Sequence, residues 1–313
     1  MRAVVQHEFG PPEVLKVEEV DAPEPIPTEI QVRVHAAGVN PVDFKTRVGE
    51  GVAAVLGDPP LRLGWDVSGV VSEVGFGVTR FSVGDEVFGM PWFPRQAGAY
   101  AEFVTAPARE FAAKPERLSH TEAGALPLAG LTAWQLVVDT IRLEPGQRIL
   151  IHGAAGGVGH LAVQVAKARG GVVIGTARAD QASFLHGLGV DEVIDYRRTA
   201  FDEVVSDLDA VIDFPGAYGQ RSLSVLRPGG ILVSVPSGAH QDVLDLAAQT
   251  GRRAASFLVE PDQVGLAGLA DLIATGKLEV EVARVFDLAD VVAAHRLAES
   301  GPGRGKVVLQ VNS

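Results

Sequence analysis

A glycine-rich turn between an apolar strand and a helix constrains this chain more than any other segment. The stretch 149–159 reads ILIHGAAGGVG and runs directly into a helical pattern that ends at Lys167. Glycines here permit a sharp turn and a close approach of the backbone to a pyrophosphate, and the helix N-terminus offers unpaired N–H groups to the anion. Taken alone, the cluster could equally be an ordinary tight turn. It lacks the Gly-Lys-Ser/Thr ending of a P-loop, which disfavours a nucleotide hydrolase.

The chain after this turn alternates between apolar strands and helix-sized segments. Such alternation is typical of a doubly wound parallel sheet, in which a glycine-rich first turn binds a dinucleotide. We therefore predict an α/β fold with a dinucleotide-binding domain. The expected strands are 148–152, 172–176, 192–194, 210–214, 231–235 and 255–259. The expected helices are 158–168, 179–187, 201–206, 219–226 and 242–249.

The first third of the chain has a different pattern, with short alternating strands separated by glycine and proline. We predict a compact, barrel-like β domain there. A helical stretch at 121–140 contains Pro127, which argues against one continuous helix. The expected strands are 2–6, 15–20, 30–37, 67–74, 85–88 and 99–104, with 306–311 at the end of the chain. The expected helices of the tail are 263–275 and 288–299.

Composition excludes several classes of function. At roughly 100–200 residues per domain, 313 residues favour two domains. The 27 Lys and Arg against 39 Asp and Glu give a net charge of −12, which disfavours a general nucleic-acid binder because such a protein needs a basic face. The chain has no cysteine, so disulfides, thiolate nucleophiles and cysteine-ligated metals are all absent.

The N-terminal sequence MRAVVQHE acquires polar residues too early for the apolar region of a signal peptide. No run of 18 uninterrupted apolar residues is present, so we expect no membrane span. We therefore expect a cytoplasmic protein.

Five segments carry a resemblance to a known family: 37–43 (AGVNPVD), 64–71 (GWDVSGVV), 131–134 (LTAW), 152–159 (HGAAGGVG) and 304–309 (RGKVVL). In this order they resemble the medium-chain dehydrogenases/reductases, specifically the zinc-independent quinone oxidoreductases similar to zeta-crystallin. The resemblance implies a GroES-like β-barrel domain over 1–118, completed by 260–313. It also implies a Rossmann nucleotide domain over 119–259, inserted between these two parts.

The resemblance also bears on metal chemistry. Zinc-dependent relatives place a cysteine where this sequence has Asn40 and a His-Glu pair where it has Trp65-Asp66, and they carry a four-cysteine lobe that is absent here. We therefore expect no functional metal. Without a Lewis acid to polarise an alcohol, alcohol oxidation is disfavoured, whereas an electrophilic conjugated acceptor can still be reduced.

Asn40 and Asp43 are the candidate catalytic residues. Hydride addition to a quinone or an α,β-unsaturated carbonyl creates an oxyanion, which the Asn40 amide could stabilise as a hydrogen-bond donor. The alternative is that Asn40 caps the turn before Pro41. Asp43 could orient Lys45, Arg47 or the cofactor amide, although a solvated surface carboxylate is the more ordinary role for such a residue.

Four other residues allow both a structural and a functional reading. His152 ends an apolar strand, so we interpret it as a hydrogen-bonded core residue rather than a catalytic one. Trp65 is expected to belong to the core or to a pocket wall. Trp92 and Phe93, flanked by prolines, either line the acceptor pocket or pack onto the barrel.

The end of the second strand predicts NADPH rather than NADH. An NAD-specific site expects an acidic residue about 20 residues beyond the glycine turn, but the sequence there is Gly-Thr176-Ala177-Arg178 and no carboxylate appears before Asp180. Thr176 can donate a hydrogen bond and Arg178 can pair with a 2′-phosphate. By resemblance, Tyr196 supplies a further phosphate contact.

Other cofactor contacts follow from the fold and the family. Thr132 matches the family's contact near the nicotinamide and phosphates, and the segments 234–237 and 257–259 fall where open α/β sheets present ligands. The predicted cofactor-binding residues are Thr132, Ala155, Gly156, Gly157, Val158, Thr176, Ala177, Arg178, Tyr196, Phe214, Ser237, Phe257, Leu258 and Val259.

These features predict an NADPH-dependent oxidoreductase that reduces quinones or related α,β-unsaturated carbonyls by hydride transfer without zinc. An enoyl-thioester or alkenal reductase is a second possibility, and a non-catalytic NADPH-binding protein of crystallin-like or redox-sensing type is a third. We expect a small-molecule substrate and a homodimer joined through strand 255–259, because this apolar sheet edge needs cover.

Overall fold

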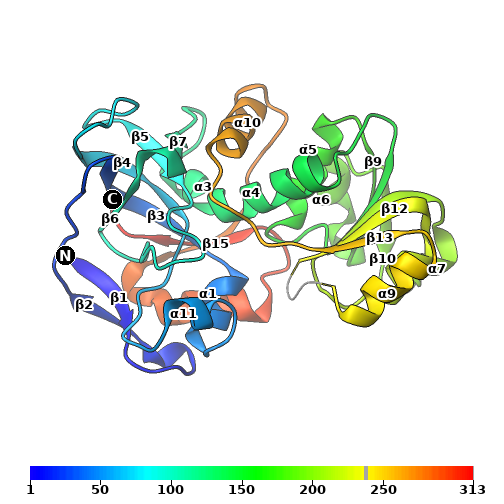
Figure 1. The fold of residues 1–313 in the computed structure, drawn as a ribbon, viewed down its shortest axis with the longest axis horizontal. Helices are drawn as coiled ribbons and strands as arrows, with labels where there is room; N and C mark the ends of the chain where they lie inside the picture. Colours follow the sequence, from blue (N-terminus) through cyan, green and yellow to red (C-terminus); the bar gives the residue numbers. More distant parts are fainter. Residues whose placement is uncertain (236–238, 313) are drawn as a thin grey trace. The chain divides into compact units, whose positions relative to one another are not determined.

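The computed structural model describes residues 1–235 and 239–312. The chain forms two compact units (Figure 1). The first unit comprises Met1–Leu131, Glu260–Thr275 and Val280–Ser313, and the second comprises Thr132–Val259 and Gly276–Glu279. Each unit therefore contains a piece of the C-terminal third.

The first unit contains a seven-stranded sheet in the order β14-β15-β3-β4-β5-β7, with β6 also paired to β3, and a hairpin of β1 and β2. The last strand runs antiparallel to β3, with Val307 opposite Val39, so the C-terminus completes the N-terminal sheet. The strands are β1 (Arg2–Gln6), β2 (Leu15–Glu19), β3 (Glu29–Val39), β4 (Val67–Val74), β5 (Glu86–Gly89), β6 (Phe103–Pro107), β7 (Phe111–Ala113), β14 (Val282–Asp287) and β15 (Lys306–Gln310). The helices are α1 (Pro41–Arg47), α2 (Ala53–Leu56), α3 (His120–Ala125), α10 (Gln263–Ala274) and α11 (Val291–Ser300).

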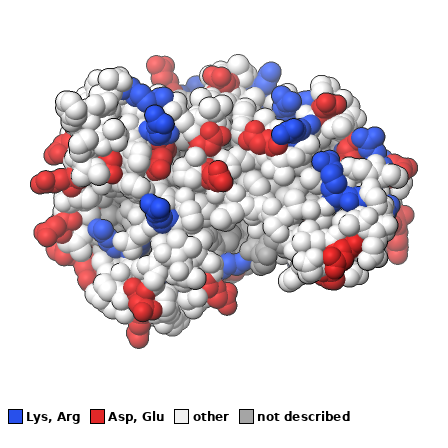
Figure 2. Space-filling view, viewed as in Figure 1, with Lys and Arg blue, Asp and Glu red and all other residues white. Residues whose placement is uncertain are grey.

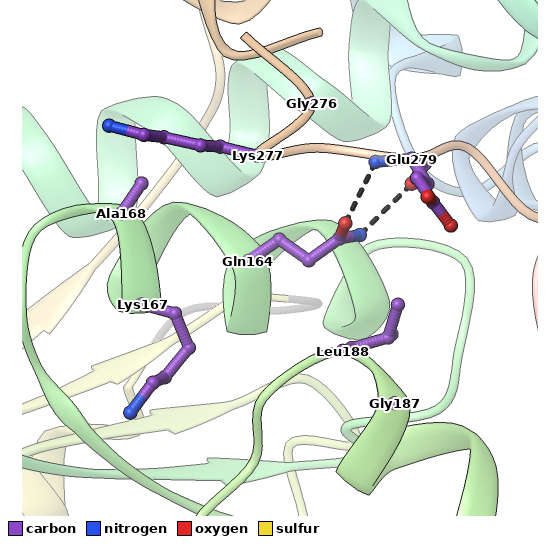
Figure 3. A pocket seen from close by; sticks show the side chains of 8 residues that line it. All are labelled: Gln164, Lys167, Ala168, Gly187, Leu188, Gly276, Lys277 and Glu279. Atoms are coloured by element: carbon purple, nitrogen blue, oxygen red, sulfur yellow. Dashed lines mark hydrogen bonds between the residues drawn. The ribbon is translucent and has the colours of Figure 1, made fainter.

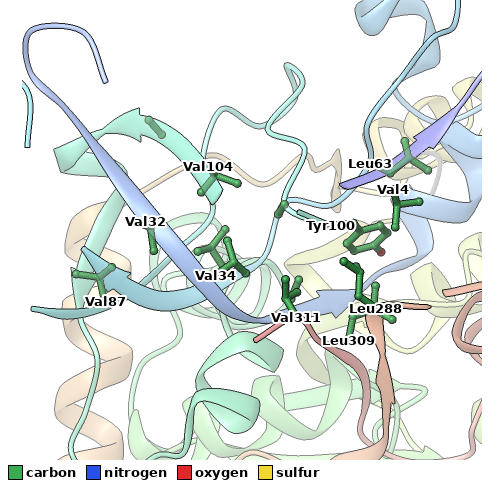
Figure 4. Close-up of a cluster of buried hydrophobic side chains, with 14 of the residues drawn as sticks. Val4, Val32, Val34, Leu63, Val87, Tyr100, Val104, Leu288, Leu309 and Val311 are labelled. Atoms are coloured by element: carbon green, nitrogen blue, oxygen red, sulfur yellow. The ribbon is translucent and has the colours of Figure 1, made fainter. Parts of the chain in front are cut away.

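Alternating valines of β3 hold the core of this unit together. Val32 and Val34 are fully buried and pack with Val87, Val104 and Leu309 from three other strands (Figure 4). Burial of each such side chain contributes about 1.5–3 kcal/mol, so packing of Leu309 in this core helps to hold β15 in the sheet.

The helical stretch around Pro127 is divided, as its proline suggests. Helix α3 ends at Ala125, and α4 (Pro127–Trp134) begins at the proline, where a missing N–H is tolerated because the first turn needs no donor. The stretch then continues as a π-helix over Gln135–Thr140. This break gives the Leu128 N–H a partner outside the helix, as described below.

The second unit confirms the doubly wound parallel sheet, in the order β10-β9-β8-β11-β12-β13. The order reverses between β8 and β11, which is the switch point where such sheets bind ligands. The strands are β8 (Arg148–His152), β9 (Val172–Ala177), β10 (Glu192–Asp195), β11 (Leu208–Asp213), β12 (Leu226–Ser234) and β13 (Arg253–Ser256). The helices are α5 (Gly159–Ala168), α6 (Ala182–Gly187), α7 (Phe201–Val204), α8 (Gly219–Ser224) and α9 (Gln241–Gln249).

Some boundaries differ from those expected. The strand expected at 255–259 is β13, which begins earlier and ends at Ser256, so Phe257, Leu258 and Val259 follow the strand rather than belong to it. Its pairing with β12 stops where that strand ends, at Ser234. Strands β7 and β14 have no counterpart in the sequence prediction. In the expected strand 99–104, Ala101 forms one isolated bridge with Ala3, and β6 begins only at Phe103.

Within the described residues, no helix has the length and apolar character needed to cross a membrane. On the face drawn in Figure 2, small groups of basic and acidic side chains are interspersed, and no continuous basic stripe is visible. This pattern agrees with the acidic composition.

Candidate functional site

The glycine-rich turn leaves space that no other residue type would leave. Gly153 has φ +69°, and a Cβ on Gly159 would lie 2.2 Å from the Gly153 carbonyl oxygen. The Ala154 N–H donates to the Thr176 carbonyl at 3.1 Å, which fixes the turn to β9. Helix α5 starts at Gly159, so its first N–H groups lie at the end of this turn. The turn is therefore a cradle that fits a pyrophosphate.

The predicted cofactor residues follow strand ends that lie level with one another. His152 is opposite both Thr176 and Asp213, and Ala177 is opposite Asp195. Because all six strands are parallel, the segments that follow them meet at one edge of the sheet, which we call the carboxyl edge. The predicted residues that immediately follow a strand or end it are Ala155, Gly156, Gly157, Val158, Thr176, Ala177, Arg178, Tyr196, Phe214, Phe257, Leu258 and Val259.

Four predicted residues need separate description. Thr132 is on α4 and is 3% exposed. Ser237 lies outside the described residues. Leu258 is largely exposed, whereas Val259 is buried.

Thr176 does not have the role that we expected for its hydroxyl. It is buried, and its Oγ1 accepts a hydrogen bond from the Gly153 N–H at 3.3 Å and lies 3.2 Å from His152 Nδ1. His152 Nε2 lies 3.3 Å from Ser222 Oγ, and burial lowers the pKa of His152 to about 4. His152 is therefore a neutral core residue, as predicted, and Thr176 supports the turn from beneath.

Arg178 directly follows β9, and its guanidinium is held by an aspartate. Its Nε and Nη2 donate to the two carboxylate oxygens of Asp180 at 3.1 and 3.3 Å. Tyr196, on the neighbouring segment after β10, is about half exposed. The two residues predicted to contact a 2′-phosphate thus belong to adjacent segments of the carboxyl edge.

Asp213 organises the loop after β11, and the sequence prediction missed it. Its buried carboxylate accepts hydrogen bonds from Gly216 N–H at 2.9 Å and Tyr218 N–H at 2.8 Å. Burial raises the pKa of Asp213. A pocket of about 260 Å³ opens beside this loop, with Ser234 and His240 among its lining residues. A carboxylate at a strand end was the only available signal.

In the first unit, Asn40 belongs to a buried polar cluster. Its Nδ2 donates to Asp66 Oδ2 at 2.8 Å, and its Oδ1 accepts from Lys306 Nζ. Lys306 Nζ also donates to the Val39 carbonyl at 3.2 Å and lies 3.6 Å from Asp66 Oδ2. Asp66 Oδ1 accepts from the Leu128 N–H at 2.6 Å. This cluster fixes the orientation of the Asn40 amide, and Lys306 and Asp66 were not predicted.

Asp43 is fully buried, so the surface interpretation of this residue was wrong. Its Oδ2 accepts a hydrogen bond from the Asn40 backbone N–H at 2.6 Å across the first turn of α1. Burial is the main cause that raises the pKa of Asp43 to about 7, and the nearby Asp66 charge adds to it. Tyr100 is also close, and burial together with Asp43 raises its pKa, although the two do not reach hydrogen-bond geometry.

Arg47 is not oriented by Asp43. Its Nη1 lies 3.1 Å from His295 Nδ1, and its Nε donates to the Gly10 carbonyl at 3.0 Å. An ion pair with Glu299 completes its contacts. Arg47 therefore joins α1 to α11 and serves the fold of the unit.

The aromatic residues near this cluster have structural contacts. Trp65 is fully buried, and its Nε1 donates to the Arg95 carbonyl at 2.6 Å. Phe93 packs edge-on against the Trp65 ring at 5.6 Å. Trp92 donates from Nε1 to the Thr105 carbonyl at 2.8 Å. The loop is therefore packed onto the sheet, which is the structural alternative considered for it.

A larger pocket in the second unit, of about 370 Å³, lies at the opposite edge of the sheet (Figure 3). It is lined by the end of α5 at Lys167 and Ala168, by the loop that leads to β10, and by Lys277 and Glu279. The Gln164 amide closes one wall through hydrogen bonds of 2.8 and 2.9 Å to the Glu279 backbone. These elements precede strands, and ligands of open α/β sheets bind where strands end. The larger pocket is therefore not the cofactor site.

Comparison with known proteins agrees with this geometry. The family described as "Alcohol dehydrogenase GroES-like domain" matches residues 26–116, and the family described as "Zinc-binding dehydrogenase" matches residues 188–309. A 2-haloacrylate reductase from Burkholderia sp is 33% identical, and the match covers 98% of both chains. The structure of the quinone oxidoreductase from Coxiella burnetii is 40% identical with a TM-score of 0.94, and it covers 100% of this chain and 99% of that one.

This chain belongs to the quinone oxidoreductase family of medium-chain dehydrogenases/reductases. The family and the expected fold, a GroES-like domain with a parallel-sheet Rossmann domain, are thereby confirmed. The Escherichia coli quinone oxidoreductase in complex with NADPH is 31% identical with a TM-score of 0.87, over 99% of this chain and 100% of that chain. As a member of the family, the chain is an oxidoreductase.

The description of one matching family mentions zinc, but the residues of this chain do not fit that metal. The sequence has no cysteine, and in the part of the chain that the structure describes, no three His, Asp or Glu residues are grouped to hold an ion. A zinc site needs at least three protein ligands in one place. At position 40 the side-chain oxygen accepts from the Lys306 ammonium instead.

Proposed function

We propose that this protein is an NADPH-dependent reductase of quinones or related α,β-unsaturated carbonyls that works without a metal. The observation that carries the proposal is the glycine cradle at the switch point of the sheet, which fits a dinucleotide. Relatives described as quinone oxidoreductase and 2-haloacrylate reductase support the acceptor class. The structures of relatives in complex with NADPH support the cofactor.

When bound, NADPH supplies the hydride. This chain therefore has to bind the cofactor, orient it against the acceptor and exclude water. Backbone N–H groups of 155–158 and the N-terminus of α5 would hold the pyrophosphate. Arg178 and Tyr196 would contact the 2′-phosphate, and Phe214 and 257–259 would hold the nicotinamide half. The predicted contact of Ser237 lies outside the described residues. A charge-assisted hydrogen bond from Arg178 favours NADPH over NADH.

Asn40 is proposed to stabilise the oxyanion that forms on the acceptor. A side-chain amide has two N–H donors. One of them is used by Asp66, and Lys306 fixes which end of the amide is the oxygen. The second N–H is the donor that we propose for the acceptor oxygen. Asp43 is a positioning residue in this scheme, because it accepts from the Asn40 backbone N–H.

The decisive experiment is a panel of acceptors with NADPH: 1,4-benzoquinone and 9,10-phenanthrenequinone, crotonyl thioesters, and alkenals. Turnover of the quinones with the highest kcat/KM is expected, and enzyme treated with a chelator should retain full activity. Tight NADPH binding without turnover of any acceptor would refute the enzymatic proposal, and loss of stoichiometric zinc together with activity would refute the metal-free part.

The role of Asn40 has its own test. Asn40→Ala should lower kcat about 10²- to 10³-fold with little change in NADPH affinity, as removal of an oxyanion donor does. Equal kcat values for the variant and the wild type would exclude this role.

A reductase of unsaturated carboxylic acids or their thioesters is the second candidate. The 2-haloacrylate reductase, which matches nearly the whole chain, favours it. A kcat/KM for 2-chloroacrylate or crotonyl thioester above that for every quinone would select this candidate over the first.

We also propose a homodimer that pairs through β13. This strand lies at the edge of the six-stranded sheet and pairs with β12 alone among the described strands. An edge with unpaired backbone groups invites a second copy. Light scattering should give about twice the chain mass of 32.8 kDa at micromolar concentration, and the mass of a single chain would contradict the proposal.

A further inference from the structure

Asp180, two residues further along the chain, provides the carboxylate that binds Arg178 within the described residues. Asp180 accepts both of the hydrogen bonds that the Arg178 guanidinium makes at this position, at 3.1 and 3.3 Å. Two parallel N–H···O bonds to one carboxylate are the geometry in which arginine also binds a phosphate. The carboxylate of Asp180 therefore occupies the part of the guanidinium that a 2′-phosphate would use.

The two partners differ in exposure. The Arg178 side chain is 34% exposed and that of Asp180 is 64% exposed. Gln181 Nε2 also donates to Asp180 Oδ2, at 3.3 Å. Asp180 is thus the more exposed member of the pair and has more room to turn toward solvent.

The charges around the Arg178–Asp180 pair nearly balance, so Asp180 has a large influence on the net charge at this place. After β10, which lies beside β9, the chain continues Tyr196-Arg197-Arg198, and Arg198 is 3.5 Å from Asp195. Three arginines and two aspartates therefore share this corner of the carboxyl edge. Loss of the Asp180 charge would double the local excess of positive charge.

We propose that Asp180 is a specificity-determining residue, whose pair with Arg178 must open for NADPH and whose carboxylate can accept a hydrogen bond from the 2′-hydroxyl of NADH. This rests on the proposed binding of the 2′-phosphate by Arg178. Asp180 reduces the preference for NADPH over NADH in two ways. The 2′-phosphate of NADPH has to displace the Asp180 carboxylate from Arg178, and the 2′-hydroxyl of NADH can donate a hydrogen bond to it. The chain then uses NADH measurably instead of excluding it.

The test is a double-mutant cycle of Arg178→Ala and Asp180→Asn, with Kd for NADPH and NADH measured from cofactor fluorescence at about 0.15 M salt, where surface pairs are screened as in cells. Asp180→Asn should tighten NADPH binding about two- to fivefold, the value of an exposed pair, and weaken NADH binding about two- to tenfold. Arg178→Ala should weaken NADPH binding about ten- to a hundredfold and leave NADH nearly unchanged. In the Arg178→Ala background, the gain in NADPH affinity from Asp180→Asn should be smaller, because no ion pair has to open there and only the change in local charge remains.

Asp191→Asn is the matched control, because Asp191 is also paired with a cation, Lys167 at 2.7 Å, but lies before β10 at the opposite edge of the sheet. It should change neither Kd. An Asp180→Asn variant that leaves both Kd values unchanged, or gains equally with and without Arg178, overturns the role of the pair.

The two proposals fail in different ways. A wild type that prefers NADH, together with an Arg178→Ala variant that weakens both cofactors equally, refutes the phosphate contact itself. If Arg178→Ala selectively lowers the affinity for NADPH and Asp180→Asn has no effect on either Kd, only the role of Asp180 is refuted.

Discussion

The carboxyl edge of the second unit and the buried cluster of the first unit use polar groups in opposite ways. At the edge, the groups that we propose to bind the cofactor are backbone N–H groups and partly exposed side chains, and the parallel strands set their positions. In the cluster of Asn40, Asp66 and Lys306, every polar group is removed from water and side chains hold one another. The edge should therefore be sensitive to backbone changes, and the cluster to the loss of any one charge.

The largest effect is expected in the cluster. Lys306→Met leaves the Asp66 carboxylate buried without its counter-charge, which typically costs about 3–5 kcal/mol of unfolding free energy. Urea unfolding measures this change, and the exposed Lys277→Met is the control. Addition of Asp66→Asn should restore part of the loss. A Lys306→Met variant as stable as the control would show that the cluster is not electrostatically coupled.

The next largest effect is expected at the edge. Gly159→Val places side-chain atoms against the Gly153 carbonyl, where even a Cβ would be 2.2 Å away. The turn has to shift, so both NADPH and NADH should bind at least about a hundredfold more weakly, since they share the pyrophosphate. Gly187→Ala is the control because its Cβ would meet no atom within 4 Å. Titration with NADPH and NADH measures the two affinities, and circular dichroism should show that the fold is kept. Unchanged affinities would show that the glycine turn does not bind the pyrophosphate.

A smaller effect is expected in the pH dependence of stability, through the buried Asp43 of the first unit. Asp43 has its pKa raised from 3.8 to about 7, so the folded state holds a proton that the unfolded state releases between these values. Its contribution to stability is therefore present below about pH 4 and is lost as the pH rises to 7. The slope is at most about 1.4 kcal/mol per pH unit.

Asp43→Asn removes this dependence, so its stability relative to wild type should rise from pH 5 to pH 8. The comparison cancels the opposite trend of buried His152 and His295, whose pKa values are lowered to about 4 and about 3. Parallel stability curves for the two proteins would contradict the assignment.

The smallest effect should come from the pocket at the opposite edge of the sheet. Lys277→Glu reverses an exposed charge there, and the affinities for NADPH and NADH should change less than about twofold, because exposed charges are screened over such separations. A larger change would mean that this pocket takes part in cofactor binding.

The second unit was largely predictable from sequence because its strands and helices alternate along the chain and each shows its own local pattern. Strand β8 matches its predicted bounds, since an apolar run ends at a glycine turn. Strand β13 was extended too far because Phe257, Leu258 and Val259 are apolar, while pairing with β12 decides where the strand ends. Strand β14 was missed because charged residues interrupt its pattern at the sheet edge.

The site was predictable only in part, for a similar reason. The turn and the residues after each strand follow from position along the chain. We expected the Thr176 hydroxyl to donate a hydrogen bond to the cofactor, because the sequence does not show that it contacts the glycine turn instead. The contact of Lys306 with Asn40 joins residues at opposite ends of the chain, and no periodic pattern encodes such a pair.

Strand β15 also sets an order of events during synthesis. The second unit is almost continuous in the chain, so most of it can fold once Val259 has left the ribosome. The sheet of the first unit lacks a strand beside β3 until Lys306–Gln310 has been made. The Ala36–Val39 part of β3 therefore waits for its partner until β15 has been made, and the sheet of the first unit is complete only after β15 has left the ribosome.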